Sequence, residues 1–149
     1  MMTILRQDTD YAMRALVCLA VPGTNGFMPV SKIASAADIP LPYAHKIIRK
    51  LRDADIVTCH RGTRGGVALA SPPEQIRLAD VINAIQGKLA FNRCLLDKKR
   101  CSRQKGCGIS RKMVTLQNQM VDMLESTTLA DVVAEENDGP RKKRKGGRR

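Results

Sequence analysis

Apolar positions in the first third of the chain recur at helical spacing in three stretches. Residues 10–21 predict a helix with one apolar side, which ends before the Pro-Gly pair that follows. Ser31 is a favourable N-cap for a short helix through Ala37, and a further helix is predicted from about Pro42 to Ala54. Between these two, Asp-Ile-Pro interrupts the helical pattern, because the residue before a proline disfavours the α conformation. Two short helices joined by a tight turn predict a helix-turn-helix unit.

The second of these two helices has one apolar side and one basic side. Its apolar stripe consists of Ile47, Ile48 and Leu51. Its polar side carries Tyr43, His45, Lys46, Arg49, Lys50 and Arg52. A basic outer face on the second helix of such a unit is typical of a helix that contacts DNA.

The hydrophobic period then changes from that of a helix to that of a strand. Residues 56–60 and 67–70 predict two short strands, and the glycine-rich residues 61–66 between them carry Arg61 and Arg64. Glycine supplies the positive φ angles that a tight hairpin turn requires. A hairpin placed directly after a helix-turn-helix is a wing. The predicted fold class is therefore mainly α with a small β-hairpin wing: a winged helix-turn-helix domain followed by a long C-terminal helix.

The longest periodic segment begins at Ser110. Its apolar residues follow one another at spacings of three and four: Met113, Leu116, Met120 and Met123. This seam suits pairing with a second helix, and packing against its own domain is the alternative. We expect a homodimer contact, because the preceding domain is already compact. Thr128 and Asp131 then have the spacing of a capping box, which predicts a last short helix.

These elements divide the chain into four parts. Residues 1–87, which end at a helix-terminating glycine, form the predicted winged helix-turn-helix domain. Residues 88–109 form a cysteine-bearing loop, and residues 110–137 contain the dimerisation helix and the last short helix. Residues 138–149 are a basic tail of low complexity, for which we expect disorder and non-specific DNA affinity.

The distribution of charge supports a nucleic-acid-binding face. The net charge is +12, of which the nine residues 141–149 contribute +7. Residues 41–111 carry 15 Lys and Arg against five acids, whereas residues 112–139 carry one Lys against six acids. A positive charge concentrated in the middle of the chain is the pattern expected of a nucleic-acid-binding face. No apolar run approaches the length of a membrane span and the N-terminus does not resemble a signal peptide, so we expect a cytoplasmic protein without membrane contact.

Three cysteines, Cys94, Cys101 and Cys107, lie in a strongly basic segment with the spacing C-x6-C-x5-C. These gaps are wider than the C-x2-4-C pairs typical of structural zinc, and they suit a larger iron–sulfur cluster. Zinc binding, thiol-based redox sensing and the absence of any cofactor remain alternatives. Three cysteines leave a fourth ligand to come from elsewhere, or a coordination position open to a signal molecule.

No residue grouping favours an enzyme. No combination of serine, histidine and carboxylate indicates hydrolysis, and the glycine-rich hairpin tip lacks the spacing of a phosphate-binding loop. A thiol-dependent redox enzyme is the rival from another functional class, but neither cysteine gap is C-x-x-C. We therefore predict a DNA-binding regulator with no catalytic turnover.

The order of these parts resembles the IscR-type (Rrf-two) family of bacterial regulators over nearly the whole length before the tail. The matching stretches are DYAMRALVCLA, VSKIASAADIPLPYAHKIIRKLRDADIV, HRGTRGGVALASPPEQIRLADVINAI, the three-cysteine loop and TTLADVV. The resemblance implies a homodimeric winged-helix transcription factor, acting as a repressor on a pseudo-palindromic site in double-stranded DNA. The helix from Pro42 to Ala54 would enter the major groove, and Arg61 and Arg64 would reach the minor groove.

The resemblance also implies a cofactor, a 2Fe-2S or 4Fe-4S cluster bound by the three cysteines, whose state would control DNA affinity. Regulators of iron–sulfur biogenesis in the family carry a histidine three positions after the last cysteine, where this chain has Ser110. They also carry glutamate at the position of His45 and serines at those of Pro40 and Pro42. The nitric-oxide-sensing branch instead uses an aspartate in the first helix, and Asp10 matches that position.

The fourth ligand has six candidates in the sequence: Asp8, Asp10, His45, His60, Asp97 and Ser110. The two histidines belong to the predicted DNA-facing helix and hairpin, Asp97 would need a cramped turn, and Ser110 suits a helix N-cap. We therefore expect Asp10 to be the fourth ligand, with a role at the helix start as the alternative.

Overall fold

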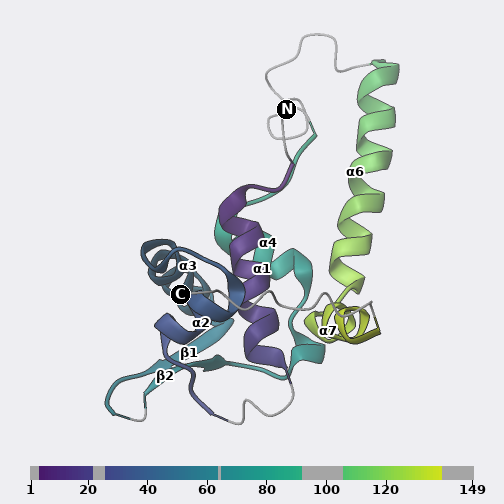
Figure 1. Cartoon of the computed structure of the whole chain (residues 1–149). Helices are drawn as coiled ribbons and strands as arrows, with labels where there is room; N and C mark the ends of the chain where they lie inside the picture. Colours follow the sequence, from purple (N-terminus) through teal and green to yellow (C-terminus); the bar gives the residue numbers. More distant parts are fainter. Residues whose placement is uncertain (1–3, 22–25, 64, 92–105, 139–149) are drawn as a thin grey trace, which may run out of the picture.

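The computed structural model describes residues 4–21, 26–63, 65–91 and 106–138 of the chain. In chain order the elements are α1 (Gln7–Ala20), α2 (Val30–Ala37), α3 (Leu41–Asp53), β1 (Val57–His60), β2 (Gly66–Leu69), the 3-10 helix η1 (Pro73–Gln75), α4 (Leu78–Gln86), α6 (Gly108–Ser126) and α7 (Leu129–Asp138). The predicted fold class, mainly helical with one two-stranded hairpin after the helix-turn-helix, is confirmed (Figure 1). None of the helices within the described ranges is long and apolar enough to cross a membrane.

The helix-turn-helix consists of α2, a tight turn and α3. The prediction of Ser31 as N-cap is wrong by two positions, because Pro29 has the extended conformation of an N-cap residue and the helix begins directly after it. At the other end of α2, Asp38 adopts the left-handed conformation with φ 54°. Pro40 then precedes the first residue of α3. The turn is therefore set by one left-handed residue and one proline, since neither continues a helix.

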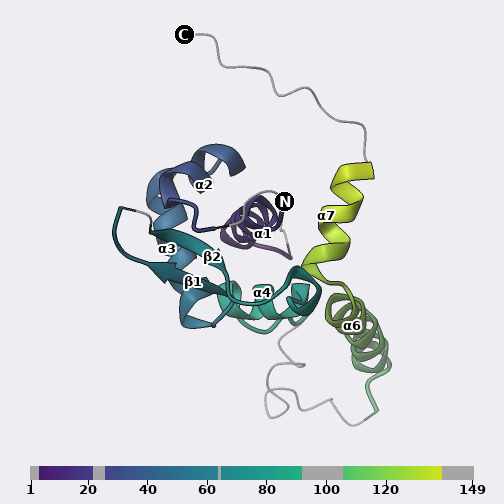
Figure 2. The ribbon, with the colours of Figure 1, turned by 90° about the horizontal axis from the view of Figure 1, so that it is seen from below.

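The hydrophobic core surrounds α1. Figure 2 shows α1 enclosed by α2 and α3 on one side and by α4 and α7 on the other. Each of these elements contributes a fully buried aliphatic side chain: Leu16 of α1, Ile33 of α2, Leu51 of α3, Val81 of α4 and Leu129 of α7. Burial of one such side chain stabilises a fold by about 1.5–3 kcal/mol, so this aliphatic centre holds the helix-turn-helix in place.

The hairpin is antiparallel, with Val57 opposite Leu69 and His60 opposite Gly66. Met28, which precedes α2, pairs with Val67 of β2 through two hydrogen bonds of 2.9 Å, as an isolated antiparallel bridge on the outer side of the hairpin. Gly66 has φ 150°, and a Cβ atom at this position would lie 2.6 Å from the Met28 backbone. Only glycine therefore allows the two segments to approach so closely.

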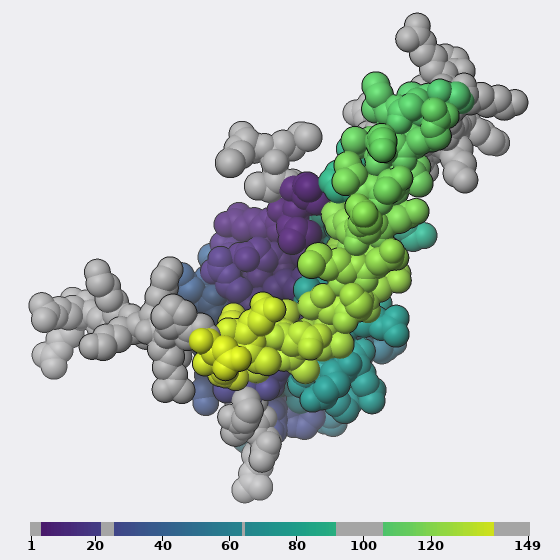
Figure 3. All heavy atoms as spheres, turned by 90° about the vertical axis from the view of Figure 1, so that its right-hand side faces the viewer, coloured from purple at the N-terminus to yellow at the C-terminus, as the bar shows by residue number. Residues whose placement is uncertain are grey.

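The last two helices have different surroundings. α6 contains no buried residue, and in Figure 3 most of its length is open to solvent. α7 packs against α1 and is anchored by Leu129, which is 1% exposed. The predicted capping box of α7 is present, because the Thr128 amide donates to the Asp131 carboxylate at 2.8 Å and the Asp131 amide donates back to Thr128 Oγ1 at 3.3 Å. The Thr128 hydroxyl also donates to the Asp131 carboxylate, at 2.8 Å. The hydrogen bond from the Thr128 amide and then the one from its hydroxyl lower the pKa of Asp131.

Candidate DNA-binding surface and cysteine segment

α3 presents a basic face to solvent because its apolar residues are taken up by the core. Ala44, Ile47, Ile48 and Leu51 are at most 4% exposed. The side chains predicted to contact DNA lie on the other side and are all exposed: Tyr43, His45, Lys46 and Arg49. Lys46 and Arg49 form no ion pair with any described residue. Their charge is therefore available to an external anion.

The wing adds a further exposed cation to those of α3. Arg61 directly follows β1 and is exposed, whereas Arg64 lies outside the described residues, so its predicted role stays a prediction. The ring of His60 at the end of β1 packs on Phe27, with 4.3 Å between the ring centroids. This contact joins the hairpin to the segment before α2, and it leaves His60 little freedom to act as a cluster ligand.

Lys50 departs from the predicted basic face. Its ammonium group turns toward the core elements, donates to the Ile85 carbonyl at 2.7 Å and lies 3.6 Å from the Asp8 carboxylate. The Ile85 carbonyl belongs to the last turn of α4, where carbonyl groups have no partner within the helix. Arg52 pairs with Asp53 at 2.7 Å. The face of α3 open to a ligand is therefore narrower than the sequence indicates.

Asp8 is the centre of a polar network at the start of α1. It accepts two hydrogen bonds from the Arg6 guanidinium, of 3.2 and 3.0 Å. Partial burial works to raise the pKa of Asp8, but the hydrogen bonds and charge of Arg6, with those of Lys50, outweigh it and hold that pKa below its usual value. Gln86 at the end of α4 accepts from the Arg6 amide at 3.0 Å and from the buried Thr9 hydroxyl at 2.6 Å. The Asp8 carboxylate is therefore engaged by contacts within the fold.

Asp10, the predicted fourth cluster ligand, lies on the surface of α1. Its carboxylate is 51% exposed and pairs with Arg14 at 2.6 Å. The Arg14 guanidinium lies 5.7 Å from the centre of the Tyr11 ring, which in turn meets the Tyr43 ring edge-on at 6.0 Å. Only two side chains therefore separate Asp10 from the first turn of α3.

The cysteine segment is described only at its end. Cys94 and Cys101 lie outside the described residues, and Cys107 is half-buried directly before α6. Cys107, not Ser110, is the N-cap of that helix, because its sulfur accepts a hydrogen bond of 3.4 Å from the Ser110 amide. Within the described residues no three His, Cys, Asp or Glu side chains gather as a metal site. The predicted set of cluster ligands therefore stays a prediction.

The four residues of the predicted seam of α6 differ in their exposure to solvent. Met113 and Met120 are partly covered, whereas Leu116 is 48% exposed and Met123 is 71% exposed. Ile109, which is 73% exposed, extends the same seam by four residues and was missed because it precedes the predicted helix start. Seam residues alternate at spacings of four and three, which is the repeat of helices that pair side by side.

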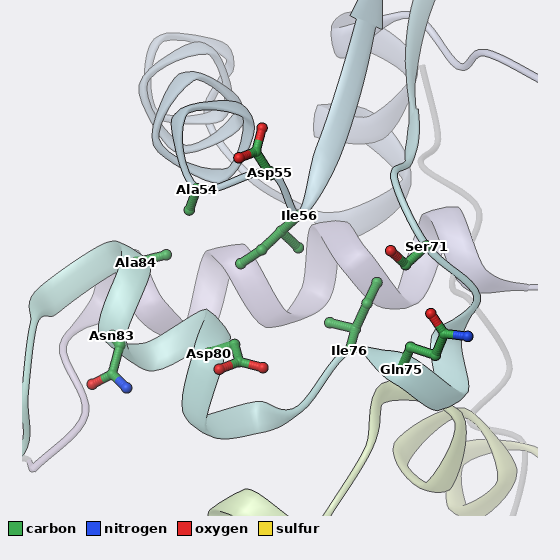
Figure 4. A pocket seen from close by; sticks show the side chains of 9 residues that line it. All are labelled: Ala54, Asp55, Ile56, Ser71, Gln75, Ile76, Asp80, Asn83 and Ala84. Atoms are coloured by element: carbon green, nitrogen blue, oxygen red, sulfur yellow. The ribbon is translucent and has the colours of Figure 1, made fainter.

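A pocket of about 360 Å³ lies between the end of α3 and α4, as shown in Figure 4. Ile56 and Ile76 form part of its wall, and Asp55 and Asp80 make its lining acidic. The two carboxylates point in different directions in Figure 4, so they do not converge on a common ligand. An acidic lining would also repel a DNA phosphate, so this pocket is not part of the proposed DNA-binding surface.

The family model "Rrf2: Iron-dependent Transcriptional regulator" matches residues 5–135. The chain belongs to the Rrf2 family. This Rrf2 protein is 28% identical to the HTH-type transcriptional regulator NsrR of Bacillus licheniformis over 130 residues, which cover 87% of this chain and 91% of that protein. An HTH-type transcriptional regulator of Aquifex aeolicus is 30% identical over 132 residues, which cover 87% of this chain and 91% of that protein.

Two solved structures share the Rrf2 fold. T. potens IscR superposes with a TM-score of 0.67 at 27% identity and covers 92% of both chains. CymR, the global cysteine regulator of B. subtilis, superposes with a TM-score of 0.75 at 22% identity and covers 91% of this chain and 98% of its own. The prediction of a winged-helix transcription regulator rather than an enzyme is confirmed.

Proposed function

We propose that this protein is a homodimeric cytoplasmic repressor that binds a pseudo-palindromic operator and is controlled by an iron–sulfur cluster. The cluster would be held by Cys94, Cys101, Cys107 and Asp10, and it would report redox state, nitric oxide or iron–sulfur supply. The observation that supports DNA binding most strongly is the exposed basic face of α3 within a helix-turn-helix of an Rrf2 regulator.

Two exposed elements support operator contact. His45, Lys46 and Arg49 would lie toward the major groove, and Arg61 and Arg64 toward the minor groove. Replacement of Arg61 or Arg64 by Ala should each weaken operator binding by about 1–3 kcal/mol. Fluorescence anisotropy with a labelled operator measures this loss. If both variants bind with wild-type affinity, the wing does not contact DNA.

The exposed seam of α6 supports a homodimer. Ile109, Leu116 and Met123 leave large apolar areas in solvent in one chain, and burial of the exposed part of each by a partner would stabilise the dimer by about 1–2 kcal/mol. We expect Leu116→Asp combined with Met123→Asp to give monomers in sedimentation experiments and to abolish operator binding. Thr115→Asp combined with Asn118→Asp, which adds the same charge at two exposed positions of α6 off the seam, should leave the dimer intact. A wild-type protein that sediments as a monomer at micromolar concentration would remove the basis of this proposal.

The donor chemistry suits an iron–sulfur cluster. Thiolates are the usual ligands of such clusters, and Cys107 stands at the end of the basic cysteine segment with its sulfur at a helix start. An iron–sulfur cluster would supply a redox-active group that nitric oxide can attack. The exposed Asp10 carboxylate is a harder donor than thiolate, and Arg14 is its one ion-pair partner among the described residues, so it would be the most readily displaced ligand.

Anaerobic purification tests the cofactor directly. The protein should be brown, and it should contain iron and sulfide in equal amounts. Asp10→Ala should change the visible spectrum of the cluster or its lifetime in air, while Arg14→Gln, which removes the partner and keeps the carboxylate, should retain the wild-type spectrum. Identical spectra and lifetimes for wild type and Asp10→Ala would exclude Asp10 as a ligand.

A regulator of the same fold without an iron–sulfur cluster is the second candidate. The observation in its favour is the likeness to CymR, a structure named for cysteine regulation. In that case the purified protein would be colourless, with zinc or no metal, and its operator affinity would not depend on anaerobic handling. A thiol-based redox protein is less well supported, because the chain belongs to a family of transcriptional regulators.

A further inference from the structure

A cavity of about 270 Å³ opens between the start of α1 and the exposed side of α3. Its lining includes Arg6 and Asp8 of the α1 start, and Tyr43, Lys46 and Lys50 of α3. We call it the basic cavity. It brings together residues about 40 positions apart in the chain, and no helical or strand pattern in the sequence indicates it.

The basic cavity has an excess of positive charge. Three cations share it with a single carboxylate, Asp8, which Arg6 already binds through two nitrogens. Lys50 is also engaged, because it donates to the Ile85 carbonyl. Lys46 makes no hydrogen bond or ion pair with a described residue, and neither does the second terminal nitrogen of Arg6, Nη1. Two residues that line the cavity therefore have donors with no partner in the described chain, and the lining carries a net charge of about +2.

The position of the basic cavity connects it to the proposed DNA-binding surface. Tyr43, Lys46 and Lys50 follow one another at spacings of three and four, so they form one side of α3. His45 and Arg49 lie on the adjacent side, which is exposed. A helix in the major groove runs between two phosphate backbones, and cations beside the base-reading residues contact those backbones.

We propose that the basic cavity binds a phosphate group, and that in the complex with the operator this group is a backbone phosphate at the edge of the major groove. Lys46 Nζ and Arg6 Nη1 are the donors, and Asp8 is the internal counterion that keeps the Arg6 guanidinium in place. The assignment to DNA rests on the proposed function, whereas the affinity for phosphate rests on the cavity alone. A contact of this kind would orient α3 without reading sequence.

The first experiment compares Arg6→Gln and Lys46→Gln with the control Arg77→Gln. Arg77 is exposed and precedes the first residue of α4, at the opposite end of that helix from Ile85. Each cavity variant should lower the affinity for operator and for random DNA by the same factor, and it should reduce the slope of log K against log salt by about 0.9. The control should leave both unchanged. Lys46→Gln guards against misfolding, because Lys46 has no structural partner among the described residues.

The second experiment distinguishes the two sources of phosphate. A neutral methylphosphonate is placed at each backbone position of one operator half-site in turn. One position should weaken binding by the wild type and cause a smaller loss with Arg6→Gln, in which Lys46 is the remaining donor. Inorganic phosphate is titrated into the free protein at constant ionic strength, and amide NMR shifts around α3 are followed. Saturation below about 1 mM, with displacement of DNA, would show that a free anion is the physiological occupant of the same cavity.

The proposal is overturned if both cavity variants keep the wild-type salt slope, no methylphosphonate position matters and phosphate causes no shifts. Failure of the proposed function gives a different result. In that case the wild type binds no operator, yet phosphate still shifts the α3 amides in the wild type and not in Arg6→Gln.

Discussion

The Thr9–Gln86 hydrogen bond offers a sharp test of how α1 is held to the end of α4. Thr9 is fully buried, and its hydroxyl donates to Gln86 Oε1 at 2.6 Å. The same oxygen accepts from the Arg6 amide at 3.0 Å, and Gln86 Nε2 donates to the Ile4 carbonyl at 3.1 Å. The chain enters the cysteine segment a few residues after Gln86, so this contact joins the helix of Asp10 to the base of that segment.

Two single substitutions, Gln86→Leu and Thr9→Val, test this hydrogen bond. Gln86→Leu should lower the free energy of unfolding more than Thr9→Val. It removes three hydrogen bonds, of which those to Arg6 and Ile4 can be replaced by water because both groups are exposed. The Thr9 hydroxyl cannot reach water, and an unsatisfied buried hydroxyl costs about 1–3 kcal/mol. Thr9→Val removes the donor and leaves Gln86 with its other partners, so it should cost about 0.5–1.5 kcal/mol.

The double variant should recover part of the loss, because an apolar pair leaves no buried group without a partner. We expect a coupling free energy of about 1–2 kcal/mol in the cycle of Thr9→Val and Gln86→Leu. Urea unfolding followed by circular dichroism at 222 nm measures all four free energies of unfolding. If Gln86→Leu costs no more than Thr9→Val and the two effects add, the Thr9 hydroxyl has found a carbonyl of its own helix, and the reasoning is refuted.

Three further predictions concern stability. Leu129→Ala should lower the free energy of unfolding by about 2–5 kcal/mol, measured by urea titration, because this fully buried side chain anchors α7. Asp131→Asn should reduce the melting temperature at pH 7 but not at pH 2. Hydrogen bonds from Thr128 lower the folded-state pKa of Asp131 below 3.8. The stabilisation by the ionised carboxylate is therefore present above the unfolded-state pKa and is lost as the pH falls through the folded-state pKa. Gly66→Ala should destabilise the protein more than Gly62→Ala in urea unfolding, because both glycines have positive φ angles but only at Gly66 would a Cβ meet neighbouring backbone; equal losses would contradict this account.

Local patterns were sufficient for most of the helix-turn-helix. The apolar spacing that ends with Leu51 predicts α3 to within one residue at each end, since an amphipathic helix must bury that stripe whatever it packs against. The glycines between the two strands predict the hairpin for the same kind of reason, because turn geometry depends on neighbouring residues only. Ser31 was misplaced as N-cap because the conformation of Pro29, rather than side-chain preference, decides where α2 begins.

The functional surface was predictable only in part. Exposure of Tyr43, His45, Lys46 and Arg49 follows from their place on the helix opposite the apolar stripe. The same argument puts Lys50 on that face, and it fails because the partner of Lys50 is a carbonyl group 35 residues away. A helical pattern says which side of a helix is polar, but it does not say which polar side chains the rest of the fold will engage.

What the sequence determined by itself is therefore the first helix, the helix-turn-helix, the hairpin and the last two helices in their order, the sign of the charge on α3 and the three-cysteine segment. What the tertiary structure decided is which of those charges are free. Arg6, Asp8 and Lys50 meet because α1, α3 and α4 pack around one aliphatic core, and the same packing leaves Lys46 beside an open cavity. Pairing energies fall off over a few ångströms, so they depend on distances in space that only the folded chain establishes.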